Sequence, residues 1–164
     1  MTYRICFVCT GNICRSPMAE AVMRQLLDEA GLADKVAVDS AGTAGWHVGD
    51  PADRRAVRAL DEAGYDGSAH RARAFDPRWF AERDLVVALD GGHLRELRAL
   101  AAAAGAPDKV RLLRSFVSAP ADGGLDVADP YYGDDRGFAT VLSQVEEGCR
   151  GILAMLERDV RPAG

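Results

Sequence analysis

The sequence predicts a single α/β domain in which a four-stranded parallel sheet carries helices on both faces. Short apolar runs, typical of buried strands, alternate along the chain with longer segments whose apolar residues recur at helical spacing. Glycine, proline and aspartate mark the junctions between these segments. A chain of 164 residues is long enough to bury one core, and no repeat or linker divides it. We therefore expect a three-layer sandwich over residues 1–160.

The first strand is expected at residues 3–8, which end in an uninterrupted apolar run. A helix should follow, with Ser16 as its N-cap, Pro17 in its first turn and Gly31 at its end. The second strand is expected at residues 35–40. The buried face of the first helix should consist of Met18, Val22, Met23, Leu26 and Leu27.

The second helix is expected over residues 50–64, because an Asp-Pro pair precedes it and a glycine closes it. The third strand is expected at residues 84–89, a run rich in leucine and valine. Asp90 should then cap the third helix, which ends at Gly105. The buried face of this helix should consist of Leu94, Leu97, Leu100 and Ala101.

The fourth strand is expected at residues 110–113 and the last helix at residues 136–158. Between them lies a long polar stretch, residues 115–128, which contains proline and glycine. Structureless stretches of this length inside compact domains are usually functional. The last helix should pack on the sheet through Phe138, Val141, Leu142, Val145, Cys149, Ile152, Leu153 and Leu156.

Composition and charge narrow the functional classes. The 20 basic and 25 acidic residues give a net charge of −5, which argues against nucleic acid or an anionic membrane as the main partner. The chain has no apolar run long enough to span a bilayer and no signal-peptide pattern. Its four cysteines do not form a disulfide framework, which indicates the cytoplasm, although export by a non-standard route stays open. Arginine greatly outnumbers lysine, which favours a bacterial source.

The most informative segment is residues 9–16, Cys-Thr-Gly-Asn-Ile-Cys-Arg-Ser, which joins the first strand to the first helix. Such a loop turns backbone N–H groups toward an anion at the helix N-terminus. Cys9 then lies where a thiolate is stabilised, and the planar guanidinium of Arg15 can bind two phosphate oxygens. Asn12 tolerates a left-handed backbone. The pattern indicates transfer of a phosphoryl group to sulfur.

This segment, together with Asp129-Pro130-Tyr131-Tyr132 near the C-terminus, resembles the low-molecular-weight protein tyrosine phosphatases of bacterial type. The likeness covers nearly the whole chain, including residues 39–43 and 70–73. The resemblance implies a Rossmann-like fold of the phosphotyrosine phosphatase I type and no metal or other cofactor. It also implies hydrolysis of tyrosine-phosphorylated proteins through a cysteinyl-phosphate intermediate, with inorganic phosphate or another oxyanion bound in the loop.

Each part of this chemistry has a candidate residue. Cys9 is expected to be the nucleophile and Arg15 the phosphate clamp. Asp129 is expected to protonate the leaving phenolate and then to activate water as a base. The rest of the phosphate-binding loop consists of Thr10, Gly11, Asn12, Ile13, Cys14 and Ser16.

The resemblance implies further roles around the loop. A supporting hydrogen-bond network is expected from Asn12, Ser16, Ser40 and His70, although ordinary capping by Ser40 and a surface position for His70 stay open.

Three further residues have roles with an open alternative. Cys14 is expected to protect Cys9 by a reversible disulfide, with simple packing as the alternative. Asp90 either orients Arg15 or only caps its own helix, and His93 is expected to be an ordinary structural histidine.

Aromatic side chains predict the shape of the substrate site. Trp46, Tyr131 and Tyr132 are expected to wall a deep slot that admits a phenyl phosphate and keeps the shorter phosphoserine away from Cys9. A half-exposed loop position is the alternative for Trp46. His47 adjoins this wall but is expected to be an ordinary surface residue. Phosphorylation of the paired tyrosines stays open.

Four alternative functions are weaker. An arsenate reductase of the same fold needs further cysteines after the third strand, and residues 90–105 contain none. Protein-arginine phosphatases carry threonine at the position of Ile13 and lack the paired tyrosines. A phosphocarrier that uses cysteine needs neither Arg15 nor Asp129. A phosphotyrosine-binding module would usually lack the nucleophile or the acid, and this chain has both candidates.

Overall fold

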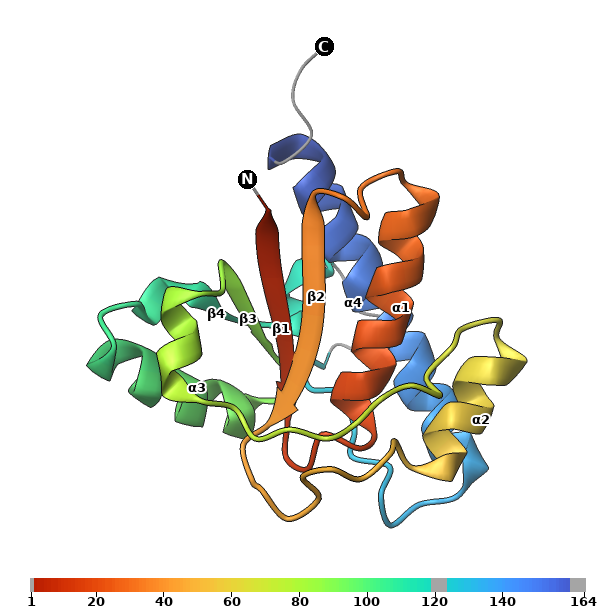
Figure 1. The fold of residues 1–164 in the computed structure, drawn as a ribbon. Helices are drawn as coiled ribbons and strands as arrows, with labels where there is room; N and C mark the ends of the chain where they lie inside the picture. The colour runs from red at the N-terminus through yellow and green to blue at the C-terminus, as the bar shows by residue number, and fades with distance from the viewer. Residues whose placement is uncertain (1, 119–123, 160–164) are drawn as a thin grey trace.

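The computed structural model describes residues 2–118 and 124–159, and its strands form one parallel sheet. β1 (Tyr3–Cys9) lies beside β2 (Val36–Gly42) on one side and β3 (Leu85–Ala88) on the other, and β4 (Val110–Leu112) follows β3. The order is β2-β1-β3-β4 (Figure 1). The predicted four-stranded parallel sheet is therefore confirmed.

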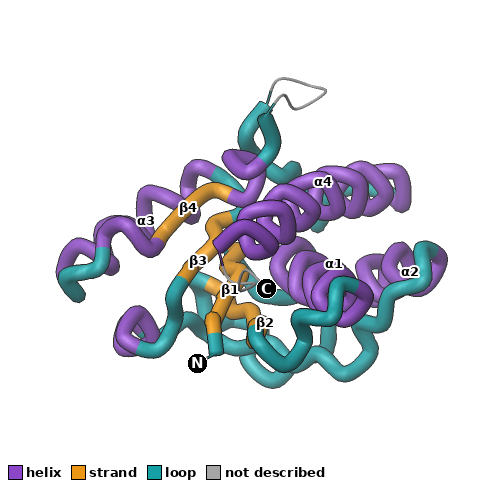
Figure 2. Tube along the Cα trace, turned by 90° about the horizontal axis from the view of Figure 1, so that it is seen from above, coloured by secondary structure: helices purple, strands orange, loops and turns teal. Residues whose placement is uncertain are grey.

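Helices cover both faces of the sheet, as predicted (Figure 2). One face carries α1 (Arg15–Glu29) and α4 (Asp135–Asp159), with α2 (Arg54–Glu62) packed against these two helices, and the other face carries α3 (Gly91–Ala103). Because alternate side chains of a strand point to opposite faces, β1 contributes to two separate cores. Phe7 packs in the larger core with α1 and α4, whereas Cys6 packs in the smaller core beneath α3.

The start of α1 differs from the prediction. The helix begins at Arg15, Cys14 occupies the N-cap position, and no side chain caps the free N–H groups. The expectation that Ser16 is the N-cap was wrong. Its hydroxyl lies 2.8 Å from the Cys9 Sγ atom and accepts a hydrogen bond from Asn12, so tertiary contacts take the place of capping.

The second helix is also shorter than expected. α2 begins at Arg54, and Asp53, not the earlier aspartate of the Asp-Pro pair, is its N-cap through a bond from the Arg55 N–H group. The Asp53 N–H group itself donates to the carbonyl oxygen of Ile13, which holds the preceding residues against the 9–16 loop. The helix ends at Glu62, two residues before the predicted glycine.

The strand bounds shift by one or two residues, and two predicted apolar faces are narrower than expected. Leu100 is 36% exposed and Leu94 is only partly buried, because α3 buries the side that carries His93, Leu97 and Ala101. Leu26 of α1 is partly buried. The stripe of α4 is buried as predicted except for Leu153, which is partly exposed.

The polar stretch predicted at residues 115–128 contains some regular structure. A 3-10 turn, η3 (Leu113–Phe116), follows β4 and takes up its beginning, and residues 119–123 lie outside the described part of the chain. Two other 3-10 turns are η1 (Pro77–Ala81) and η2 (Pro107–Lys109). Within residues 2–118 and 124–159, no helix is both long and apolar enough to cross a bilayer.

Candidate active site

The topology places the site at the end of β1. The chain passes from β1 to β2 on one side and later to β3 on the other, so a crevice opens at the carboxyl ends of these strands. Cys9 is the last residue of β1 and Asp90 follows β3, so both lie at this edge. The 9–16 loop crosses the crevice from β1 to the start of α1.

The 9–16 loop is held in a tight shape by its backbone. Asn12 has a φ of 59° and is the one non-glycine residue with positive φ in the described part of the chain. At the end of β2, a Cβ atom on Gly42 would lie 2.5 Å from the Thr10 carbonyl oxygen, so only glycine lets the two segments approach this closely. The Cys9 carbonyl oxygen accepts a bond from the Thr43 N–H group at 2.8 Å.

A chain of hydrogen bonds runs beneath the loop. The Asn12 side chain is fully buried and donates from Nδ2 to the hydroxyls of Ser16 at 2.8 Å and Ser40 at 2.9 Å. Ser40 in turn donates to Glu20 Oε1 at 2.7 Å. The Ser16 hydroxyl lies 2.8 Å from Cys9 Sγ. Sequence reasoning missed Glu20, because its place in the chain depends on how α1 packs beside β2.

His70 belongs to the same network. Its Nε2 atom lies 2.6 Å from the carbonyl oxygen of Asn12, and since a carbonyl group only accepts, Nε2 must carry the hydrogen. Burial lowers the pKa of His70 below 6.5, which favours the neutral ring. The neighbouring Arg73 N–H group donates to Asn12 Oδ1 at 2.9 Å. The structure thus brings together all four residues of the expected network.

Arg15 is buried and fixed in orientation. Its Nη1 atom donates to Asp90 Oδ2 at 2.8 Å and to the Val127 carbonyl oxygen at 3.1 Å. Asp90 also accepts the His93 N–H bond that caps α3, so it both caps the helix and orients Arg15. Burial alone would raise the pKa of Asp90, but the bonds from His93 and Arg15 outweigh it, and the pKa lies below its ordinary value.

Asp129 lies opposite the loop. Its side chain is 54% exposed, and its Oδ2 atom is 3.6 Å from Arg15 Nη2. Its Oδ1 atom accepts the Tyr131 N–H bond at 3.1 Å. Arg55 of α2 attaches this segment by donating to the carbonyl oxygens of Tyr131 and Gly133 at 2.9 and 3.0 Å. Nothing in the sequence around Arg55 indicates this role, because its partners lie 76 and 78 residues away.

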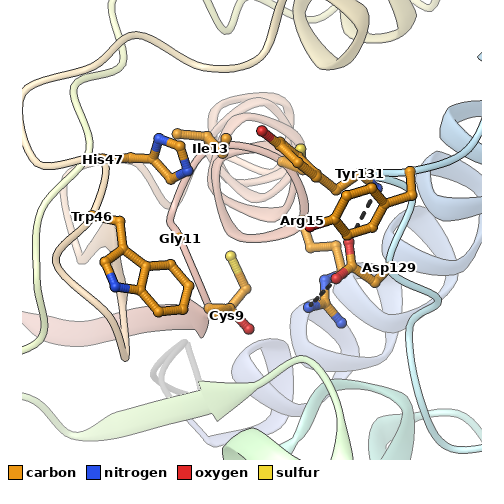
Figure 3. Close-up of a pocket in the computed structure, with 11 residues that line it drawn as sticks. Cys9, Gly11, Ile13, Arg15, Trp46, His47, Asp129 and Tyr131 are labelled. Carbon is orange, nitrogen blue, oxygen red and sulfur yellow. Dashed lines mark hydrogen bonds and ion pairs between the residues drawn. The ribbon is translucent and has the colours of Figure 1, made fainter.

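The side chains enclose a cavity of about 220 Å³. In Figure 3, Trp46 and His47 lie on one side of Cys9, and Tyr131 and Asp129 lie on the other. Trp46 is 79% exposed and Tyr132, which also lines the cavity, is 95% exposed. The slot predicted between the aromatic side chains is therefore shallower than expected, because Trp46 and Tyr132 are largely exposed to solvent. The lining residues are Cys9, Thr10, Gly11, Ile13, Cys14, Arg15, Trp46, His47, Asp129, Tyr131 and Tyr132.

Two histidines and a second cysteine complete the surroundings. His47 lines the cavity and its Nδ1 atom lies 3.2 Å from Asp50 Oδ2, so it contributes to the site. His93 is buried and bonds to Thr10 at 2.8 Å. Sequence reasoning treated both as ordinary residues. Cys14 also lines the cavity; burial, and then the charge of Asp53, raise its pKa to about 12, so its thiol stays protonated near neutral pH.

No group of three or more metal-ligating side chains occurs within the described ranges, 2–118 and 124–159. The arrangement at the end of β1 combines a buried sulfur, a fixed guanidinium and a carboxyl group around one small cavity. Such a set can bind a tetrahedral oxyanion and transfer a proton beside it.

Comparisons with known proteins agree with this geometry. The family model described as low molecular weight phosphotyrosine protein phosphatase matches residues 4–162. A low molecular weight protein-tyrosine-phosphatase of Streptomyces coelicolor is 56% identical over 160 residues, which cover 98% of this chain and 97% of the relative.

Solved structures show the same fold. YfkJ from Bacillus subtilis superposes with a TM-score of 0.90 at 32% identity, covering 98% of both chains. A Drosophila arginine phosphatase superposes with a TM-score of 0.86 at 33% identity, covering 94% of this chain and 98% of the other. The family model and the Streptomyces relative both match nearly the whole chain. This shows that the chain belongs to the low molecular weight protein-tyrosine-phosphatase family, a class of phosphoric monoester hydrolases.

Proposed function

We propose that this enzyme hydrolyses phosphotyrosine in proteins in two steps, with Cys9 as nucleophile, Arg15 as phosphate clamp and Asp129 as general acid and then base. The observation that carries the proposal is the convergence of these three side chains on one cavity of about 220 Å³ at the end of β1. Their separation in sequence, 120 residues from Cys9 to Asp129, makes a chance convergence a poor explanation.

In the first step, the Cys9 thiolate attacks phosphorus, an S–P bond forms and the bond from phosphorus to the tyrosine oxygen breaks. The leaving phenolate takes the proton of the Asp129 carboxyl group. The Ser16 hydroxyl, 2.8 Å from Cys9 Sγ, supports negative charge on sulfur by donating a hydrogen bond. Arg15, with Nη1 held by Asp90, presents its remaining N–H groups to the phosphoryl oxygens from a fixed position.

In the second step, water attacks the phosphorus of the cysteinyl-phosphate. The S–P bond breaks, Cys9 leaves as thiolate and the Asp129 carboxylate takes the proton of the water. Inorganic phosphate is released. The two roles follow one another directly, because the carboxylate that the first step leaves on Asp129 is the base that the second step needs.

The cavity walls support an aryl phosphate as substrate. Tyr131 and Tyr132 pack edge to face with ring centroids 4.9 Å apart, and Trp46 and Ile13 also line the cavity. A phenyl ring can pack between such apolar walls while its phosphate reaches the loop. The alternative substrate is phosphoarginine, because one of the structural neighbours is an arginine phosphatase. Ile13 and the paired tyrosines favour the aryl phosphate.

The test is phosphate release from matched phosphotyrosine, phosphoserine and phosphoarginine peptides in the presence of a chelator. We expect turnover of phosphotyrosine alone, lost in Cys9→Ser and in Arg15→Lys. Asp129→Ala should lower turnover mainly for substrates with poor leaving groups, whereas Asp108→Ala, which removes an exposed carboxylate on η2, is the matched control.

Two outcomes would overturn parts of the proposal. Preference for phosphoarginine would leave Cys9 as nucleophile and refute the aryl slot. Unchanged turnover of phosphotyrosine in Asp129→Ala would refute the assignment of the acid.

A further inference from the structure

The first turn of α3 contacts the 9–16 loop at two places. His93 lies in this turn, is 4% exposed and has its Nε2 atom 2.8 Å from the Thr10 hydroxyl. Asp90 caps the same turn and binds Arg15 at 2.8 Å. Thr10 follows Cys9 directly, and Arg15 comes near the end of the loop. One helical turn therefore touches the loop beside both its sulfur and its guanidinium.

The two contacts are joined through Asp90. Its Oδ1 atom accepts the His93 backbone N–H bond at 2.9 Å, and its Oδ2 atom accepts the bond from Arg15. The His93 Nδ1 atom lies 3.2 Å from Asp90 Oδ1 without the alignment of a hydrogen bond, and it is buried with no other partner. The buried ring therefore has Nδ1 beside the Asp90 carboxylate and Nε2 bonded to Thr10.

We propose that His93 is a positioning residue for the phosphate-binding loop. Its imidazole fixes Thr10 while Asp90 fixes Arg15, so the first turn of α3 sets the distance between the sulfur and the guanidinium. This inference rests on the proposed function of the loop, but it assigns to His93 a part that the two reaction steps do not use. It deepens that function because small errors in the position of reacting groups lower the rate strongly.

The charge of Asp90 decides how the ring holds Thr10. The carboxylate faces Nδ1, so a hydrogen on Nδ1 is favoured over a lone pair. Nε2 is then an acceptor, and the Thr10 hydroxyl donates to it. In this arrangement the hydroxyl hydrogen of Thr10 points toward α3. The Thr10 hydroxyl is then held in one orientation and does not rotate freely.

The test is a double-mutant cycle of His93→Leu and Thr10→Val, with His93→Gln as the rescue variant. Leucine removes both ring nitrogens, valine removes the hydroxyl at nearly constant volume, and glutamine restores a polar atom near the position of Nε2. Each single change should raise the Kd for inorganic phosphate, measured by calorimetry, and lower kcat/KM by about three- to tenfold, as expected for one lost buried hydrogen bond. Urea unfolding of each variant checks that the fold is retained.

The expected result is that the double variant is no worse than either single variant, and that His93→Gln recovers most of the affinity for phosphate. Additive effects of the two changes, or a glutamine variant as weak as the leucine variant, would overturn the proposal. The readout on phosphate affinity separates this inference from the proposed function. Wild-type protein that bound phosphate but did not hydrolyse phosphotyrosine would refute the function, and the cycle would still decide the role of His93.

Discussion

Replacing Asn12 with alanine should lower the free energy of unfolding by about 4–5 kcal/mol. The side chain is fully buried and makes three hydrogen bonds, to Ser16 at 2.8 Å, to Ser40 at 2.9 Å and from the Arg73 N–H group at 2.9 Å. A net contribution of about 1 kcal/mol for each bond gives about 3 kcal/mol. The φ of 59° adds about 1–2 kcal/mol, because alanine is strained in the left-handed region.

A glycine at the same position separates the two causes. Asn12→Gly loses the same three hydrogen bonds but adopts a positive φ without strain, so it should be more stable than Asn12→Ala by about 1 kcal/mol. Both variants should also lose phosphatase activity, since Ser16 and Ser40 lose the donor that joins them.

The assay is urea unfolding at neutral pH, with Gln25→Ala as control. Gln25 makes one exposed bond to Glu29, so its loss should change the free energy of unfolding by no more than about 0.5 kcal/mol. A decrease of less than about 1 kcal/mol for Asn12→Ala would refute the hydrogen-bond account. An alanine variant as stable as the glycine variant would refute the argument from φ.

Three further changes test other parts of the structure. Asp90→Asn removes the charge beside Arg15 and should lower kcat/KM for a phosphotyrosine peptide by about tenfold or more. Gly148→Ala places a Cβ atom 2.5 Å from Leu113 Cγ and should lower the free energy of unfolding by about 1–3 kcal/mol in urea. Burial lowers the pKa of His70, so the unfolded chain binds the proton more readily and stability should fall as the pH drops through about 6.5; His70→Gln should reduce this slope in a pH series of urea midpoints.

Each of these has a clear contrary result. Full turnover by Asp90→Asn would show that Arg15 does not depend on the charge of its partner. An alanine at position 148 without effect would show that α4 and η3 can separate at no cost. An unchanged pH slope in His70→Gln would place the responsible proton on another group.

The parts of the fold that were predictable depend on local pattern. The stripe of α4 repeats at helical spacing from Phe138 to Leu156, and the strands are short apolar runs between turn residues, so both could be found without knowing their neighbours. The 9–16 loop was also predictable, because its sulfur, asparagine and guanidinium are close in sequence and carry a specific chemistry.

The predictions that were wrong concern features that depend on tertiary contacts. Ser16 has the composition of an N-cap, but its hydroxyl bonds to Cys9 and Asn12 across the loop. α2 begins later than predicted, at Arg54, because the Asp53 N–H group before it bonds to the carbonyl oxygen of Ile13 in the loop. In both cases the hydrogen bond is made to a partner that only the folded chain brings near, so the local sequence does not predict it.

The charged groups that we assign to the substrate are fixed to different degrees. Arg15 is buried, and its Nη1 atom bonds both to Asp90 and to the Val127 carbonyl oxygen. Asp129 is more than half exposed and lies in a segment that Arg55 attaches through two backbone carbonyl groups. The phosphate group is the same in every substrate and suits a rigid site, whereas the protein surface around the phosphotyrosine differs from one substrate to the next. A rigid clamp beside a more exposed acid therefore suits an enzyme that recognises one group on many proteins.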